Sequence, residues 1–341
     1  MGAATPIGRN VWSSAAAARA GICGFYEHPY MIDTAGEPMR VARAPWLDVS
    51  IEGTKRFFEL LYPAIDEALV PIKDSIETRS IKVGLALGLP PHRPGRPEDL
   101  VDTLRYLLNN RYPNIFSKIL TFEVGHSAGH LALDVAIKQC TVGSADTYVV
   151  AGVDSYLAPK TLEWIEECDQ LHGGGEFNNA WGFIPGEAAS AILISSASVA
   201  EQFGYESFGE IVSVGIGDET NLIKTEAVCV GKGLTQAFRS ALAALAPDEI
   251  IHNVYCDLNG EKYRADEYGF SSLRTEDRFR SASDFIALAD CWGDVGAASA
   301  PLQIIQAVIA NRKQYDKGPL SIVWASSEGG ERGAAVFRAP G

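Results

Sequence analysis

Short apolar runs alternate with longer amphipathic segments along most of the chain. The runs predict strands and the amphipathic segments between them predict helices, an alternation that indicates an α/β protein. Strands are predicted at residues 81–88, 119–124, 147–153, 186–194, 209–215, 253–258, 320–325 and 333–338. Helices are predicted at residues 10–19, 53–72, 97–110, 159–168, 198–203, 233–245 and 296–311.

Other parts of the chain lack a regular pattern. Residues 1–8 are typical of a turn, and residues 21–44, which include Pro29 and Pro38, are predicted to be irregular. Residues 171–179 are rich in Gly and Asn. Their Gly-Gly-Gly run lacks the preceding strand and the Lys of a phosphate-binding loop, so a flexible loop is predicted.

The junction at residues 119–136 is the most informative part of the sequence. ILTFEV suits a buried strand, and LALDVA begins a mostly apolar helix. Gly125 and Gly129 permit a tight turn and close packing of the backbone. Such a turn exposes one side chain beside helix N–H groups, where many enzymes place a nucleophile.

Two side chains at this turn are candidates for nucleophilic chemistry. GHSAG at residues 125–129 fits the G-x-S-x-G pattern of serine hydrolases and malonyl-type acyltransferases, with Ser127 as the nucleophile. Ser127 needs a histidine base, and His130, His172 and His252 follow it; a plain helix cap is the competing interpretation. His126 could take an acyl group itself or fill a pocket as a polar residue.

Composition and charge narrow the class of protein. Of 341 residues, 47% are hydrophobic and 21% charged, which is ordinary for a globular protein. Acidic residues outnumber basic ones 43 to 29 and no basic run occurs, so nucleic acid is not an expected partner. No apolar run has membrane-spanning length and no signal peptide is recognisable, so we expect a cytoplasmic protein without a membrane partner.

The cysteine pattern gives no sign of a metal centre. The six cysteines form no CxxC pair and show no metal-ligand spacing; they are Cys23, Cys140, Cys168, Cys229, Cys256 and Cys291. Free thiols in a reducing compartment are therefore expected. No cofactor or metal site is predicted.

Several segments, in the right order along the chain, together resemble the β-ketoacyl synthase branch of the thiolase-like family. GEAASAILI at residues 186–194 resembles its G-E-G-A-G segment, and GEIVSVG at 209–215 the strand that opens its second half. WGDVGAASAPL at 292–302 resembles its G-H-T-x-G-A-A-G helix start. Residues 1–8 resemble the turn after its first strand, which would then precede Gly2, and residues 326–335 its gating loop.

This resemblance implies a thiolase-like αβαβα layered fold made of two similar halves, residues 1–205 and 206–341. It also implies a homodimer and a decarboxylating Claisen condensation on acyl groups carried by carrier protein or coenzyme A. In the family, a Cys thiolate takes the acyl group, and two His residues, or His and Asn, stabilise the enolate oxygen.

The sequence departs from the family at each of these catalytic positions. By the resemblance, His126 occupies the Cys position, and Asn259 and Gly293 occupy the two His positions. Residues 285–291 lack the usual Lys, and EGGER at 328–332 lacks the gating Phe. Together these losses predict a scaffold that no longer condenses acyl groups.

Asn259 and the two acidic residues near it can be interpreted without a catalytic role. Asn259 itself is either an amide donor to a thioester carbonyl or a turn residue before Gly260. Asp257 and Glu261, four residues apart, are interpreted as parts of a solvated loop rather than as a carboxylate pair.

Our leading hypothesis is a catalytically inactive ketosynthase-like scaffold that acts through binding. Its partner would be a second copy or an active ketosynthase, as for a chain length factor; acyl carrier protein or an effector of bacterial type VI secretion are the other candidates. The alternative hypothesis is an active acyltransferase or thioesterase using Ser127 or His126. Since residues 120–124 are too apolar for a bare sheet edge, they are predicted to pair across a two-fold axis.

Overall fold

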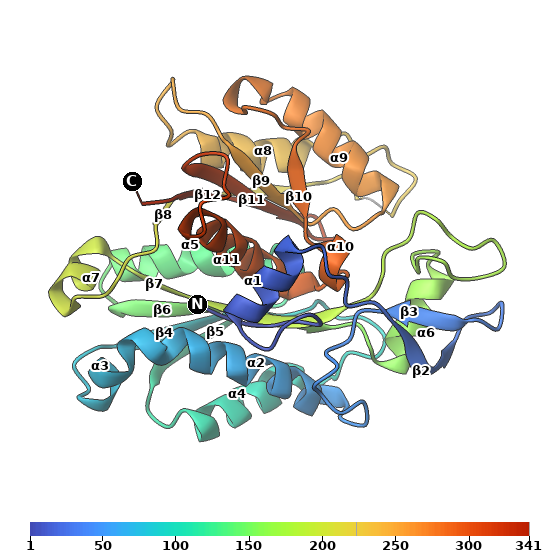
Figure 1. Cartoon of the computed structure of the whole chain (residues 1–341), viewed down its shortest axis with the longest axis horizontal. Helices are drawn as coiled ribbons and strands as arrows, with labels where there is room; N and C mark the ends of the chain where they lie inside the picture. The colour runs from blue at the N-terminus through green and yellow to red at the C-terminus, as the bar shows by residue number, and fades with distance from the viewer. Residues whose placement is uncertain (223, 341) are drawn as a thin grey trace.

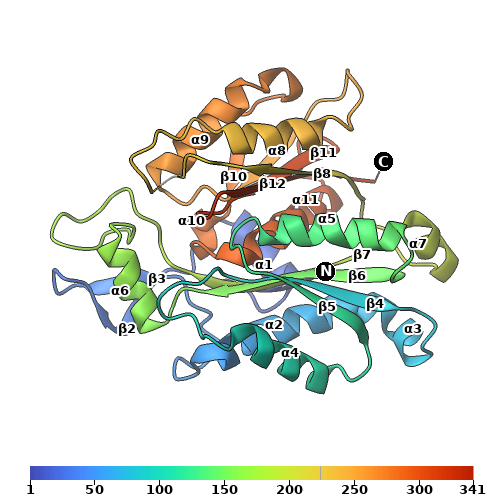
Figure 2. The same ribbon diagram turned by 180° about the vertical axis from the view of Figure 1, so that it is seen from behind.

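Two mixed five-stranded sheets, each covered on its outer face by helices, enclose a central helical layer (Figures 1 and 2). This computed structural model describes residues 1–222 and 224–340. Helices α2 and α4 cover the first sheet, α5 and α11 lie between the sheets, and α8 and α9 cover the second sheet. The predicted αβαβα fold class is confirmed.

The first sheet has the order β1-β7-β6-β4-β5. Strand β4 pairs in parallel with β5 and β6, whereas β7 pairs antiparallel with β6 and β1. Its strands are β1 (Gly2–Ala4), β4 (Val83–Gly88), β5 (Phe116–Phe122), β6 (Thr147–Ser155) and β7 (Glu187–Ser195). The parallel centre of the sheet explains why β4 and β6 are continuous buried runs.

The second sheet repeats this topology. Its order, taken from the matching end, is β8-β12-β11-β9-β10, with the same sequence of parallel and antiparallel pairings. Its strands are β8 (Glu210–Asp218), β9 (Asn253–Cys256), β10 (Phe285–Ala287), β11 (Leu320–Ser326) and β12 (Glu331–Arg338). The two halves of the chain therefore build similar α/β units.

The helices fill the remaining layers. Those of eight or more residues are α1 (Val11–Arg19), α2 (Gly53–Leu69), α4 (Leu100–Arg111), α5 (Ala128–Thr141), α6 (Pro159–Glu167), α8 (Lys232–Leu242), α9 (Lys262–Leu273) and α11 (Ser299–Arg312). Shorter ones are α3 (Lys73–Glu77), α7 (Ala197–Phe203), α10 (Ala289–Trp292) and the 3₁₀ turns Val70–Ile72, Glu276–Arg278 and Gly296–Ala298. Within the described part of the chain, no helix is long and apolar enough to cross a membrane.

The contact between α5 and α11 holds the central layer together. Helix α11 is buried on every side from Ser299 to Ala310, as expected for a mostly apolar helix in the middle of a large protein. At Gly129, a Cβ atom would lie 2.8 Å from the side chains of both Ala300 and Pro301. The second glycine of the GHSAG turn is thus required for helix packing.

Two sequence predictions need correction, and one helix was missed. Residues 1–8 are not a bare turn, because β1 lies at Gly2–Ala4 and pairs with β7. The segment predicted to be irregular holds a hairpin, β2 (Tyr26–Ile32) and β3 (Pro38–Val41), with a register shift between Glu27 and Ile32. Helix α9 was not predicted at all, and it carries part of the candidate site.

Candidate functional site

The candidate site lies between the two sheets, where loops from both halves meet at the start of α5. His126 follows β5, Asn259 follows β9, and Asp294 follows α10. Nε2 of His126 lies 2.8 and 2.9 Å from the two carboxylate oxygens of Asp294, and Nδ2 of Asn259 donates to Asp294 Oδ2 at 2.6 Å. The structure thus brings His126 and Asn259 together around a residue that the sequence analysis did not select.

Gly293 lies beside this group but contributes no side chain to it. Its φ of 72° is in the left-handed region, and a Cβ atom there would lie 2.6 Å from the carbonyl oxygen of Ile184. Glycine is therefore needed at residue 293 to turn the chain. The next residue, Asp294, takes the place beside His126.

Arg264 on α9 adds a second cation to the group. Its Nη1 donates to Asp257 Oδ2 and to the Ser326 carbonyl oxygen, both at 2.8 Å, and its Nε lies 3.2 Å from Glu261 Oε2. Its Nη2 lies 3.4 Å from Nε2 of His126. The Arg264 side chain is fully buried, so all of its charge is balanced inside the protein.

The prediction that Asp257 and Glu261 lie in a solvated loop is wrong. Asp257 is 7% exposed and Glu261 is 4% exposed. Helix α9 begins at Lys262 and turns Arg264 back toward both carboxylates, which removes them from water. They form a buried ion-pair group around one guanidinium instead of a solvent-facing pair.

Further hydrogen bonds tie this group to the loops around it. Glu261 accepts from Asn259 Nδ2 at 3.0 Å, from the Tyr263 hydroxyl at 2.7 Å and from Gln170 Nε2 at 2.7 Å. Glu328, in the predicted gating loop, forms an ion pair with Lys224. Gln170 thereby joins a loop of the first half to the buried carboxylate of Glu261 in the second.

The charges in the group shift the pKa values of its members. Burial works against the charged forms of Asp294 and His126, but their mutual attraction and hydrogen bond outweigh it. The pKa of Asp294 is therefore lowered well below its ordinary value, and the pKa of His126 is raised. Burial raises the pKa of Asp257 despite the neighbouring Arg264. Both shifts favour the charged forms of His126 and Asp294.

Little free space remains beside this pair. The cavity next to His126 has a volume of about 20 Å³ and is lined by His126, Cys256, Asp257, Asn259, Leu288, Ala289, Trp292, Gly293, Asp294, Val295, Ser299, Leu302 and Gln303. That volume holds about one water molecule. An acyl thioester does not fit beside His126 in this conformation.

Ser127, the alternative nucleophile, is buried and paired with another serine. Its Oγ lies 2.7 Å from Oγ of Ser327, which also accepts from the Ser127 N–H at 2.9 Å. His130 instead approaches the Val323 carbonyl oxygen at 3.2 Å, and burial lowers its pKa to about 4. The hydrogen bonds of Ser127 in the described residues thus assemble no Ser-His pair. Ser127 does occupy the N-cap position of α5, but its side chain makes no capping hydrogen bond.

Comparison with known proteins finds similarity to solved structures. No protein-family model matches the chain, and no curated protein matches it in sequence. Solved structures do match it over nearly its full length. A type II polyketide ketosynthase, solved with its acyl-carrier protein and bound to a hexaketide, has 14% identity and a TM-score of 0.79, with 99% of this chain and 98% of that chain covered.

Two other ketosynthase structures match to a similar degree. The ketosynthase from module 6 of the bacillaene synthase of Bacillus subtilis 168 has 15% identity and a TM-score of 0.80, covering 100% of this chain and 71% of that one. The ishigamide ketosynthase/chain length factor has 18% identity and a TM-score of 0.73, covering 100% of this chain and 98% of that one. At such identities the likeness concerns the fold: this chain has the thiolase-like fold of ketosynthases.

Proposed function

We propose that this chain is a catalytically inactive ketosynthase-like subunit that acts by binding another protein. One observation carries the proposal: the buried ion pair of His126 and Asp294 occupies the place where the resemblance puts the acylated thiol and its partners. The pair and Arg264 leave room for about one water molecule. The group therefore joins loops instead of binding an acyl chain.

The nucleophile that condensation needs is missing from the group. Cys256 lines the same cavity, but burial raises the pKa of its thiol and its Sγ lies 3.5 Å from the Ile286 carbonyl oxygen. A thiol in that state is not a nucleophile, because the thiolate is the reactive form. Acyl transfer to Cys256 is not supported.

The groups that would donate hydrogen bonds to an enolate oxygen are also either occupied or missing. Both hydrogens of the Asn259 amide are used, since Nδ2 donates to Asp294 and to Glu261. Gly293, at the other donor position, has no side chain. Stabilisation of a developing oxyanion requires donors aimed at the reacting atom, and these are aimed at carboxylates.

The surface that suits a partner is strand β5, at one edge of the first sheet. Phe122 accepts from the Leu89 N–H through its carbonyl, so Thr121, one residue before, directs its backbone groups away from β4. Ile119, Leu120 and Phe122 are half-buried in the monomer. An edge of this kind is a template for pairing with another strand.

The partner would be a thiolase-like chain that offers its own matching strand. A second copy gives a homodimer, and an active ketosynthase gives a pair like that of the ketosynthase/chain length factor structure. An adaptor role, including one for a secretion effector, would use the same scaffold without a condensing partner. Acyl carrier protein would then meet the complex through the active chain.

Two measurements test this function. The purified chain is incubated with acyl-coenzyme A and malonyl-coenzyme A, and we expect neither an acyl mass shift nor release of carbon dioxide. Native mass spectrometry of the chain captured from its own cells should show a stoichiometric partner or a second copy. Condensation by the unmodified chain, or a chain that is monomeric and alone, would overturn the proposal.

A further inference from the structure

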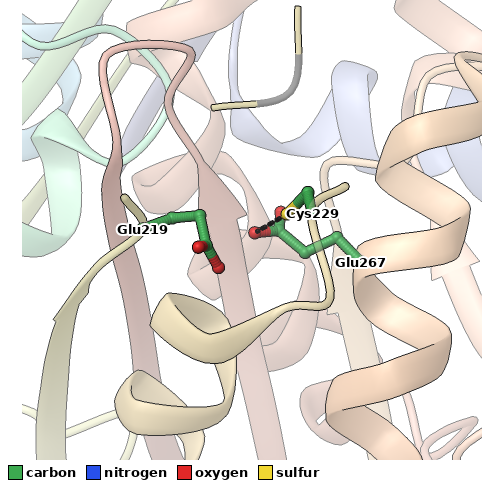
Figure 3. A group of neighbouring side chains, drawn as sticks. All are labelled: Glu219, Cys229 and Glu267. Atoms are coloured by element: carbon green, nitrogen blue, oxygen red, sulfur yellow. Dashed lines mark hydrogen bonds between the residues drawn. The ribbon is translucent and has the colours of Figure 1, made fainter. Parts of the chain in front are cut away.

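Three potential metal ligands meet in the second half, next to the turn between β11 and β12. They are Glu219, just after β8, Cys229, in the connection to α8, and Glu267, on α9 (Figure 3). One ligand atom from each lies within 4.8 Å of the other two. The spacing of residues 219, 229 and 267 matches no sequence motif, so this cluster is visible only in the structure.

The two carboxylates are buried and held in place by the protein. Glu219 is 4% exposed, and its two oxygens accept from the Asn221 N–H at 3.1 Å and the Gly233 N–H at 3.0 Å. Glu267 is fully buried, and its Oε1 accepts from Arg332 Nε at 2.6 Å. Cys229 Sγ lies 3.7 Å from the same Oε1. The ligand side chains are thus largely positioned in advance.

One atom of this cluster lacks the partner that its burial demands. Oε2 of Glu267 is buried and has no hydrogen-bond partner among the described residues. A buried carboxylate oxygen left unsatisfied costs more than a neutral group would, and such atoms in native structures call for an explanation. A cation bound by the Glu267 carboxylate through Oε2 would remove that cost.

We propose that Glu219, Cys229 and Glu267 bind a thiophilic divalent cation of the Zn²⁺ class. Zn²⁺ takes thiolate and carboxylate ligands together, whereas Mg²⁺ and Ca²⁺ prefer oxygen ligands alone. Two carboxylates and a thiolate facing the guanidinium of Arg332 leave two negative charges, which a divalent cation neutralises. Three protein ligands leave one tetrahedral position for water.

The cation would act on structure and would not take part in acyl chemistry. It links the β8–α8 connection to α9, the helix that also carries Arg264. Arg332, beside the cation, donates through Nη1 to the Ser327 carbonyl oxygen at 2.6 Å, and Ser327 contacts Ser127. The metal site therefore stabilises the segment around Ser327 that contacts the start of α5 at the candidate site. This inference is independent of whether the chain is inactive.

Cobalt binding tests the site on the full chain under reducing conditions. Co²⁺ is titrated in and the sulfur-to-metal charge-transfer absorption in the near ultraviolet is followed. We expect one equivalent to give this absorption and Zn²⁺ to abolish it by displacement. Cys229→Ser should remove the absorption, while Cys168→Ser, which changes an exposed cysteine just after α6, should leave it unchanged.

Other results would overturn the site. Absence of the absorption in the unmodified chain would do so, as would its persistence in Cys229→Ser. A second readout covers the case in which a variant folds poorly: one equivalent of Zn²⁺ should raise the melting temperature of the unmodified chain, and of Cys168→Ser, but not of Glu219→Gln. Equal stabilisation of all three would show that Zn²⁺ binds elsewhere.

Discussion

Nε2 of His126 lies 2.8 Å from Oδ1 of Asp294, and the two side chains are 5% and 2% exposed. The pair joins the end of β5 in the first half to the segment before α11 in the second. A buried pair of this kind contributes little over an apolar pair, but removing one partner leaves an uncompensated charge. Removing either partner should therefore lower the free energy of unfolding measurably.

Asp294→Asn should destabilise the fold strongly. It leaves His126 without the carboxylate that balances it, and breaking a buried pair costs about 3–5 kcal/mol. Urea unfolding followed by circular dichroism gives the free energy of unfolding. The control is Asp266→Asn, an exposed position on α9, which should change that free energy by less than about 0.5 kcal/mol. Equal effects of the two changes would contradict a stabilising role for the Asp294 pair.

The His126 pair should make stability depend on pH in one direction. Burial disfavours the imidazolium, but Asp294 outweighs burial and raises the pKa of His126 above its ordinary value. A raised folded pKa means that the contribution is complete below the unfolded pKa, about 6.5, and is lost as pH rises through the folded value.

Comparison with His126→Gln isolates this contribution from other titrating groups. The difference in free energy of unfolding between the natural chain and this variant should be larger near about pH 6 than near about pH 9. Urea titrations of both proteins at the two pH values measure it. A difference that is constant, or that grows with pH, would show that His126 is not charged in the folded protein.

His126→Cys should not restore condensation. The new thiol would lie beside Asp294, whose negative charge disfavours a thiolate, and the two N–H groups of Asn259 already donate to carboxylates. We expect no carbon dioxide from malonyl-coenzyme A and no condensed product by mass spectrometry. Turnover by this variant would mean that the scaffold keeps its enolate-stabilising donors, and would reassign the site.

A fluorophosphonate probe should leave Ser127 unlabelled. Its hydroxyl is fully buried and bonded to Ser327, with no histidine in its described hydrogen bonds. Peptide mapping after labelling gives the answer, with Ser127→Ala as the matched control. Ser127→Ala should cost about 1 kcal/mol of stability through the lost hydrogen bond. A labelled peptide that disappears in Ser127→Ala would instead support the acyltransferase or thioesterase hypothesis.

Most strands and the α/β class were predictable because they depend on local pattern, whereas the αβαβα layering was implied by the family resemblance. β4, β6 and β11 are mostly apolar and buried along their whole length. Helix α9 was missed because its buried face is largely polar: Arg264, Glu267 and Ser271 point inward beside Tyr268. A helix that buries charged residues shows no apolar stripe for periodicity to detect.

The candidate site was predictable only in part, for a related reason. The resemblance selected His126 and Asn259, because each follows a strand whose pattern is clear. Asp294 and Arg264 come from a short turn and from the missed helix, and their role arises only when distant loops meet. The hairpin of β2 and β3 was missed because Pro29 and Pro38 suggested irregular chain, whereas proline is tolerated in edge strands.

Pairing through β5 is tested by Thr121→Pro. The change removes an outward N–H near the end of β5, so a partner strand loses a ladder hydrogen bond and meets the proline ring. The control Thr121→Val keeps that N–H and removes only the hydroxyl, which accepts from Arg105 at 3.2 Å. Light scattering at micromolar concentration should show a dimer for the natural chain and for Thr121→Val, and a monomer for Thr121→Pro. The natural chain could itself be monomeric in this measurement. The edge of β5 is then expected to be an interface with a ketosynthase, and Thr121→Pro should abolish co-purification with that partner. Assembly that is unchanged in Thr121→Pro, with either kind of partner, would place the interface away from β5.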